Sequence, residues 1–228
     1  MLVILNCIDD ESPRRAFDEH TAGRLAALAG DEMALAHLAG EGPLPTAEDG
    51  DRLLISGSEL SASRRNPRDD ELFASIQSFL DAGRPVLGIC YGHQMLARLL
   101  GGDEACRRSA TPEFGWKRLA IEPANPLFEG IDDLVSAHSH YDEVQSVPES
   151  CEVIARTDRC AVQAFQIRER PVWGVQFHPE IQYEQGEAMF ARNLENDPAV
   201  AAFFRSELEG PDRLAANDRL FRNFFAAS

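Results

Sequence analysis

Short apolar runs alternate with longer amphipathic stretches along the first half of the chain. Apolar residues dominate positions 2–6, 52–55 and 86–89, a length typical of buried strands. Between them, residues 14–29 are rich in alanine and leucine, and residues 69–82 place apolar side chains at helical spacing. Strands that alternate with helices favour an α/β fold with a parallel sheet.

The second half of the chain has a different pattern. Its apolar runs lie close together, at residues 117–122, 134–137, 152–155, 161–167 and 172–177. Closely spaced strands are joined by turns rather than by crossover helices, which pairs them in antiparallel fashion. We therefore predict an α/β fold with an open, mostly parallel sheet flanked by helices and a small antiparallel addition.

Length and charge narrow the picture. The chain has 228 residues, 44% of them hydrophobic, enough for one substantial core but short for two domains, so residues 1–228 are expected to form a single domain. A net charge of −16 repels phosphate backbones and anionic lipid surfaces, which disfavours nucleic-acid and membrane binding. The opening apolar run is too short for a signal peptide and no stretch reaches transmembrane length, so a cytoplasmic location is expected. The five cysteines are odd in number and irregularly spaced, which fits reduced thiols better than disulfides or a zinc site.

The most informative motif follows the apolar run at 86–89. Residues 88–94 read GICYGHQ, which places Cys90 where a buried strand should turn sharply into a helix. Such a turn needs small residues beside the nucleophile, and Gly88 and Gly92 supply them. The positive end of the following helix points at the sulfur and favours negative charge there. Cys90 is therefore the candidate nucleophile.

A second motif supplies the base that a cysteine nucleophile needs. Residues 172–180 read VWGVQFHPE, an apolar run that ends in His178 and Glu180. Pro179 biases His178 toward extended backbone, where residues two apart share a face, so the Glu180 carboxylate can orient the imidazole. Taken alone, a cysteine such as Cys90 is more often a small buried core residue, and a histidine such as His178 is more often a surface or hydrogen-bonded residue. Together, each at the end of a predicted strand, they favour catalysis.

These two motifs resemble those of the class I glutamine amidotransferases. Two further segments agree: residues 53–58, LLISGS, resemble the family's oxyanion strand and loop, and residues 137–144, AHSHYDEV, resemble the segment that lines its glutamine pocket. The four matches occur in the family's order and cover roughly residues 1–180. The resemblance implies the family's flavodoxin-like fold, and it implies hydrolysis of the glutamine side-chain amide with release of ammonia.

The resemblance also assigns roles to individual residues. It implies a triad of Cys90, His178 and Glu180, which acts through a γ-glutamyl thioester, and an oxyanion hole made by the backbone N–H groups of Gly57 and Tyr91. No metal or other cofactor is implied.

Four further residues match the family's substrate site. By this resemblance Gln94 contacts the bound glutamine. The same match places Ser139, Tyr141 and Asp142 where the family holds the α-amino and α-carboxylate groups of the substrate, largely through backbone atoms.

Two departures keep alternative functions open. Ser58 stands in place of the family's second loop glycine, and Glu59 in place of the following proline. The chain shows no synthetase domain, so the amidotransferase interpretation expects a separate synthase partner to receive the ammonia. The alternatives are a self-sufficient γ-glutamyl peptidase and, from a different class, a non-catalytic regulator, which the intact triad disfavours. Residues 113–116, EFGW, resemble a segment shared by the GMP synthase-like and γ-glutamyl peptidase-like branches and do not separate them.

The end of the chain is less familiar. Residues 220–225 resemble the closing helix of the family, and residues 184–210 form an extra helical segment before it. The apolar side chains of that segment are most simply core residues that pack on the sheet. The alternative is that these side chains form a face to which a partner protein docks.

Overall fold

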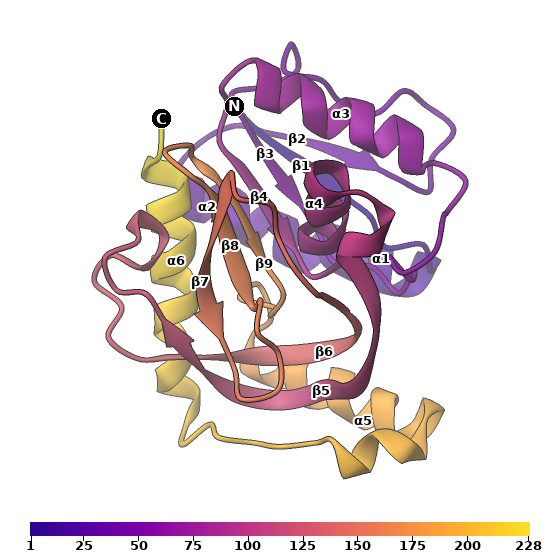
Figure 1. Cartoon of the computed structure of the whole chain (residues 1–228), viewed down its shortest axis with the longest axis vertical. Helices are drawn as coiled ribbons and strands as arrows, with labels where there is room; N and C mark the ends of the chain where they lie inside the picture. The colour runs from indigo at the N-terminus through magenta and orange to yellow at the C-terminus, as the bar shows by residue number, and fades with distance from the viewer.

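The computed structural model describes all 228 residues and is built on a nine-stranded sheet with the order β2-β1-β3-β4-β9-β8-β7-β5-β6 (Figure 1). Its first five strands are parallel: β2 (Met33–His37), β1 (Leu2–Asn6), β3 (Arg52–Ile55), β4 (Val86–Ile89) and β9 (Val172–Val175). β1, β4 and β9 are buried along their whole length, which explains their nearly continuous apolar sequences.

The remaining strands form the antiparallel part of the sheet. They are β8 (Ala164–Ile167), β7 (Cys151–Arg156), β5 (Cys106–Ile121) and β6 (Leu134–Val144). β5 and β6 extend well beyond the apolar runs that predicted them and form a long two-stranded ribbon. The mixed sheet confirms the predicted α/β class with its antiparallel addition.

Helices cover both faces of the parallel strands. On one face lie a continuous helical segment, comprising α1 (Glu11–Ala16), a π-helical turn (Phe17–Ala22) and α2 (Gly23–Ala29), and α6 (Ala215–Ala226). On the other lie α3 (Asp69–Asp81) and α4 (Tyr91–Gly101). Alternate residues of β1 supply the two cores, because Leu2 and Ile4 pack on the first face and Val3 and Leu5 on the second.

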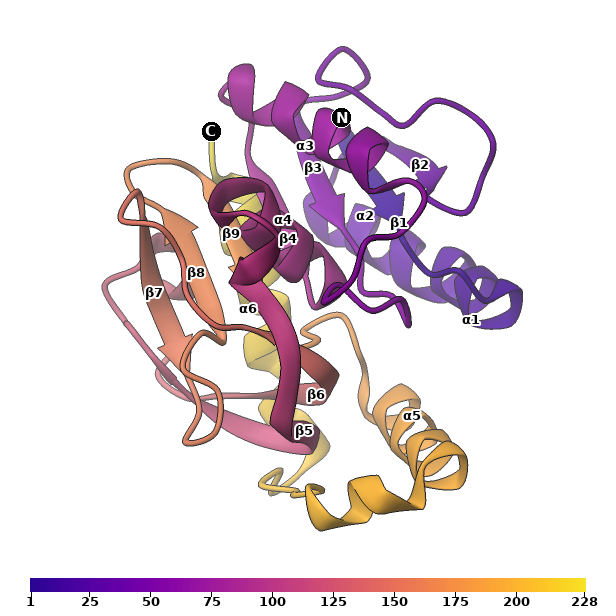
Figure 2. The same ribbon diagram turned by 45° about the vertical axis from the view of Figure 1, so that its right-hand side comes forward.

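A helical segment before the closing helix packs against the β5–β6 ribbon (Figure 2). It consists of α5 (Tyr183–Asn196) and a 3-10 turn (Pro198–Ala202), whereas residues 203–210 are not helical. The indole of Trp116 stacks on Tyr183 and donates to Glu187 Oε1 at 2.8 Å. Two glycines allow this close approach: a Cβ at Gly186 would lie 2.3 Å from Trp116, and one at Gly115, where φ is +103°, would lie 1.9 Å from the Arg205 carbonyl oxygen.

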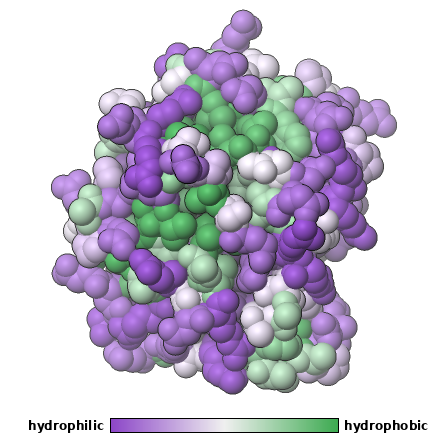
Figure 3. Space-filling model, in the orientation of Figure 1, coloured by the Kyte–Doolittle hydropathy of each residue, from purple (hydrophilic) through white to green (hydrophobic).

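The surface is mainly polar. Figure 3 shows hydrophilic residues over most of one face, with apolar residues gathered over α4 and strands β7 to β9. Met1 and Tyr183 are the exposed large hydrophobic residues. No helix has the length and apolar character required to cross a membrane.

Candidate active site

Cys90 sits at a sharp turn between β4 and α4. Its backbone has φ 49° and ψ −100°, a conformation that L-residues rarely adopt, and its N–H donates to the Val175 carbonyl of β9 at 2.8 Å. The turn closes only because its neighbours are glycines. A Cβ at Gly88 would lie 2.5 Å from the backbone of Gly92, and one at Gly92 would lie 2.7 Å from the Ile55 carbonyl oxygen.

His178 follows the neighbouring strand β9. Its N–H donates to the Ala137 carbonyl at 2.8 Å, and its Nδ1 lies 2.7 Å from Glu180 Oε1. Burial by itself lowers the pKa of His178, but the charges of Glu180 and Cys90 outweigh it and raise that pKa well above the usual value. The arrangement favours the protonated imidazolium form of His178. Because Nδ1 is bound to Glu180, Nε2 is the nitrogen available for proton transfer.

Gly57 lies against both of these residues. A Cβ on Gly57 would be 2.9 Å from His178 Cε1 and 3.5 Å from Cys90 Cβ. The backbone N–H groups of Gly57 and Tyr91 donate to no backbone carbonyl, which leaves both free for an oxyanion. The Tyr91 side chain is fully buried, with its hydroxyl 3.4 Å from Asp69 Oδ1, so only its backbone belongs to the site.

A buried amide that the sequence interpretation did not single out also reaches the sulfur. Gln176 Nε2 lies 3.6 Å from Cys90 Sγ, and its Oε1 accepts from Gln94 Nε2 at 3.1 Å. Gln94 Nε2 also donates to the Asp142 carbonyl at 2.8 Å. One sequence signal pointed to Gln176: it precedes His178 by two residues, the same spacing that joins His178 to Glu180.

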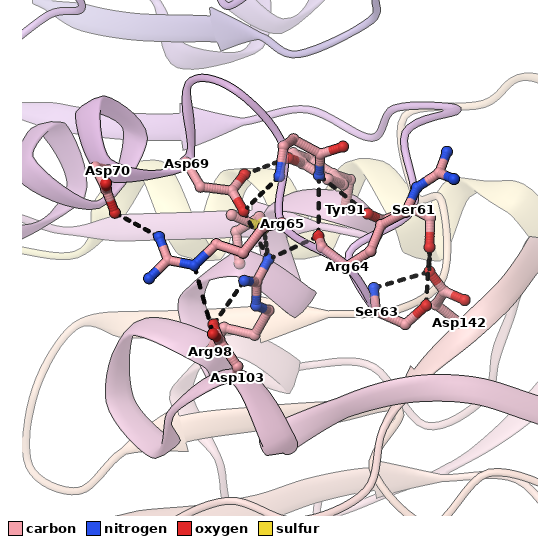
Figure 4. Close-up of polar contacts among 12 residues, drawn as sticks. Ser61, Ser63, Arg64, Arg65, Asp69, Asp70, Tyr91, Arg98, Asp103 and Asp142 are labelled. Carbon is pink, nitrogen blue, oxygen red and sulfur yellow. Dashed lines mark hydrogen bonds and ion pairs between the residues drawn. The ribbon is translucent and has the colours of Figure 1, made fainter.

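Asp142 connects this site to the loop after β3. Its Oδ2 accepts from Ser61 Oγ at 2.6 Å and from the Ser63 N–H at 3.1 Å (Figure 4). Its Oδ1 is buried and has no hydrogen-bond partner; the nearest cation is Arg108, 4.0 Å away. The carboxylate therefore holds the loop that continues from the predicted oxyanion segment.

Ser139 and Tyr141 lie on β6 but turn their side chains toward the helical segment. Asn193 donates to Ser139 Oγ at 2.8 Å, and the Tyr141 hydroxyl donates to Asp197 Oδ2 at 2.9 Å. Burial raises the pKa of Tyr141 to about 12, reinforced by that carboxylate. The side chains of Ser139 and Tyr141 thus do not converge with that of Asp142, and only their backbone remains for a substrate.

An arginine-rich recess of about 460 Å³ adjoins this loop. Five arginines line it: Arg64, Arg65, Arg98, Arg107 and Arg108. Figure 4 shows that Arg98 binds Asp69 and Asp103, at 3.0 and 2.6 Å, and that Arg65 binds Asp103 as well as Asp70. Carboxylates therefore neutralise much of the positive charge in the recess.

The other cysteines and two buried histidines, His93 and His138, are poorly suited to catalysis. Burial raises the pKa of the Cys7 and Cys151 thiols and raises that of Cys106 and Cys160 to about 12, which keeps them protonated and unreactive. Burial lowers the pKa of His93 and of His138 to about 3, so both are neutral near pH 7. No group of three or more His, Cys, Asp or Glu side chains is arranged to hold a metal ion.

Comparisons with known proteins identify the family of this chain. Residues 43–196 match the family model "Glutamine amidotransferase class-I". The GMP synthase [glutamine-hydrolyzing] of Idiomarina loihiensis is 37% identical over 147 residues, which cover 60% of this chain and 26% of that protein. A GMP synthase [glutamine-hydrolyzing] subunit from Methanopyrus kandleri is 36% identical over 148 residues, covering 63% of this chain and 73% of that protein. The chain therefore spans only about a quarter of the longer relative.

A solved structure extends the likeness to the whole fold. The crystal structure of a glutamine amidotransferase from Methylobacillus flagellatus has a TM-score of 0.76 and 24% identity to this chain, and the match covers 99% of this chain and 92% of that one. This chain belongs to the class-I glutamine amidotransferase family.

Proposed function

We propose that this protein hydrolyses the side-chain amide of glutamine through a Cys90–His178–Glu180 triad and supplies the ammonia to a separate synthase. One observation carries the proposal: His178 lies between the Glu180 carboxylate, 2.7 Å from Nδ1, and Cys90 at a strained turn, with Gly57 against both. A nucleophile, a base and an orienting acid in that order are what acyl transfer requires.

In the first half-reaction, the Cys90 thiolate attacks the carboxamide carbon of glutamine. The C–S bond forms and the carbonyl oxygen takes up negative charge, which the free N–H groups of Gly57 and Tyr91 stabilise. His178 then gives its proton to the leaving nitrogen, the C–N bond breaks and ammonia departs. The Glu180 carboxylate stabilises the imidazolium until that transfer.

In the second half-reaction, water replaces ammonia. His178 Nε2 takes a proton from the water, whose oxygen attacks the γ-glutamyl thioester. The C–S bond breaks, glutamate leaves and the thiolate–imidazolium pair is restored. The same oxyanion donors act again because the second tetrahedral intermediate has the same geometry.

Substrate recognition is assigned to polar groups near Cys90. The hydrogen bonds of Gln94 use its Nε2, so its Oε1 is available to accept from the substrate. The unpartnered Oδ1 of Asp142 suits the α-amino group, and the backbone of residues 139–142 suits the α-carboxylate.

The proposed acceptor of the ammonia is a synthase chain. The support comes from relatives that are named as one subunit of GMP synthase [glutamine-hydrolyzing], a name that implies a further chain in the enzyme. A glutaminase that is always active would waste glutamine, so its rate should depend on that partner. The oxyanion loop is the place for such control, because Gly57 can turn its N–H toward or away from the oxyanion, and one donor is worth about 10² to 10³ in rate.

Steady-state assays on the purified chain test this proposal. Glutamine and γ-glutamyl peptides are compared as substrates, each with and without a GMP synthase-type synthase chain. We expect slow hydrolysis of glutamine alone and acceleration by the synthase. High turnover on γ-glutamyl peptides that exceeds turnover on glutamine and ignores the synthase would instead establish a γ-glutamyl peptidase. No turnover on either class, with or without the synthase, would indicate a non-catalytic regulator.

A further inference from the structure

The buried amide of Gln176 has no role in the triad, yet it contacts the reacting atom. Its side chain is fully buried, and its Nε2 lies 3.6 Å from Cys90 Sγ. Its Oε1 is held by Gln94 Nε2 at 3.1 Å, and its backbone N–H donates to the Gln163 carbonyl at 2.8 Å. The amide is therefore fixed at both ends, with one end against the sulfur.

The hydrogen-bonding groups around Gln176 decide which end of its side-chain amide faces Cys90. The Asp142 carbonyl can only accept, so the Gln94 group that faces it at 2.8 Å is the NH₂. The other N–H of that NH₂ points at Gln176, which must present its oxygen there. The NH₂ of Gln176 is left to face the sulfur. Flipping the side-chain amide of Gln94 or of Gln176 would place two donors or two acceptors face to face, so the orientation of both amides is fixed.

We propose that Gln176 is a catalytic residue whose amide donates to the Cys90 thiolate, and that Gln94 holds it in the donating orientation. A hydrogen bond to a thiol sulfur is weak, whereas the same bond to a thiolate is charge-assisted, so the contact favours the charged nucleophile. The sulfur then lies between two stabilising groups, the imidazolium of His178 and the amide of Gln176. When His178 gives its proton to the leaving nitrogen, the Gln176 N–H still faces the sulfur. This inference rests on the proposed function, because it concerns the same thiolate.

The main alternative is that Gln176 only satisfies Gln94 and fills space. If Gln176 donates to the thiolate, its replacement should do more than reduce stability. The pH at which Cys90 becomes reactive should also rise. Hydrogen bonds to charged groups favour the charged form by about 10- to 100-fold, so the half-maximal pH should move up by about one to two units. The plateau rate at high pH should not fall, because a less stabilised thiolate is at least as nucleophilic.

Gln166 provides a matched control. It is also a buried glutamine, on β8, and both ends of its amide are bonded: it accepts from Asn125 Nδ2 at 2.6 Å and donates to the Arg170 carbonyl at 2.7 Å. Gln166→Met removes a buried amide of the same size without touching the sulfur. Its loss of stability should therefore resemble that of Gln176→Met.

The experiment measures alkylation of Cys90 by iodoacetamide from pH 5 to 10, with peptide mapping to assign the modified cysteine and Cys90→Ala as the blank. We expect the half-maximal pH to rise in Gln176→Met, to rise further in Gln176→Glu, and to stay unchanged in Gln166→Met. In glutamine hydrolysis below the wild-type midpoint, kcat of Gln176→Met should fall about 10- to 100-fold with little change in KM.

An unchanged alkylation profile in folded Gln176→Met would overturn the inference, even if its glutaminase rate fell. If Gln176→Met does not fold, Gln176→Glu decides in the same way, because it keeps the oxygen that accepts from Gln94. Alkylation does not require glutamine turnover. If the wild-type chain hydrolyses no glutamine, the proposed function is refuted. If the variants still show the shifted alkylation profile in that case, this inference stands.

Discussion

Replacing Gly57 by alanine tests whether Gly57, Cys90 and His178 meet at one point in the site. Gly57 is not in the left-handed region, so alanine meets no general backbone penalty there, and the effect comes from the added Cβ. That carbon would lie 2.9 Å from His178 Cε1, whereas ordinary contacts begin at 3.4 Å. The imidazole must retreat by about half an ångström, although Glu180 holds its Nδ1 at 2.7 Å.

We expect kcat of Gly57→Ala to fall about 10- to 100-fold, because small displacements of a proton-transfer group cost this much and because alanine restricts rotation of an oxyanion donor. Stability should fall by only about 1 kcal/mol, since overpacking is partly offset by the lower entropy of the unfolded chain. For a chain of this size, that corresponds to a drop of about 2–4 °C in Tm.

The assay combines glutaminase turnover with thermal unfolding, and Gly23→Ala is the control. Gly23 lies in a helix, and a Cβ there meets nothing within 4 Å, so Gly23→Ala should raise Tm slightly and leave turnover unchanged. Wild-type turnover in Gly57→Ala at a normal Tm would refute the view that Gly57, Cys90 and His178 meet at one point.

The same contacts support four other predictions. Cys90→Ala should abolish hydrolysis with little change in Tm, because no other thiol can form the thioester; residual turnover above about 1% would contradict this. His178→Asn should reduce turnover by several orders of magnitude and Glu180→Gln by less, as measured by kcat; equally small effects would exclude the triad. The raised pKa of His178 contributes stability that is complete below about pH 6.5 and is lost as pH rises through the folded-state pKa, so urea unfolding should show a larger deficit for Glu180→Gln at pH 6 than at pH 9. Because the pKa of buried His138 is lowered to about 3, this residue should contribute a fall of about 1.4 kcal/mol per pH unit to the unfolding free energy between roughly pH 6 and 3.5, and His138→Phe should reduce the measured slope by that amount if it folds.

The sequence alone predicted the candidate triad because its residues lie at the ends of two strands, in two short segments. Cys90 requires glycines on both sides for its turn, and His178 and Glu180 are two residues apart, so short segments contain both motifs. The buried strands were equally visible, because strands covered on both faces are apolar along their whole length.

The sequence analysis predicted neither strand β2 nor the full lengths of β5 and β6. The sequence of β2, Met33–His37, consists mostly of good helix formers, and it is extended because it pairs with β1 at the edge of the sheet. β5 and β6 are long because they pair with each other through polar stretches that carry no clear apolar alternation. Pairing between distant segments overrides local preference in both cases.

The contacts between distant segments belong to the tertiary structure alone. The sequence predicted Gln94 and Asp142 as substrate-site residues, but only the fold brings Asp142 to Ser61 and Gln176 to the sulfur. These partners are far apart in the chain, and buried amides and carboxylates choose whichever donor or acceptor the fold presents. Local geometry, set by a few adjacent residues, could thus be derived from the sequence, whereas the polar network that surrounds the nucleophile depended on how the strands and loops pack.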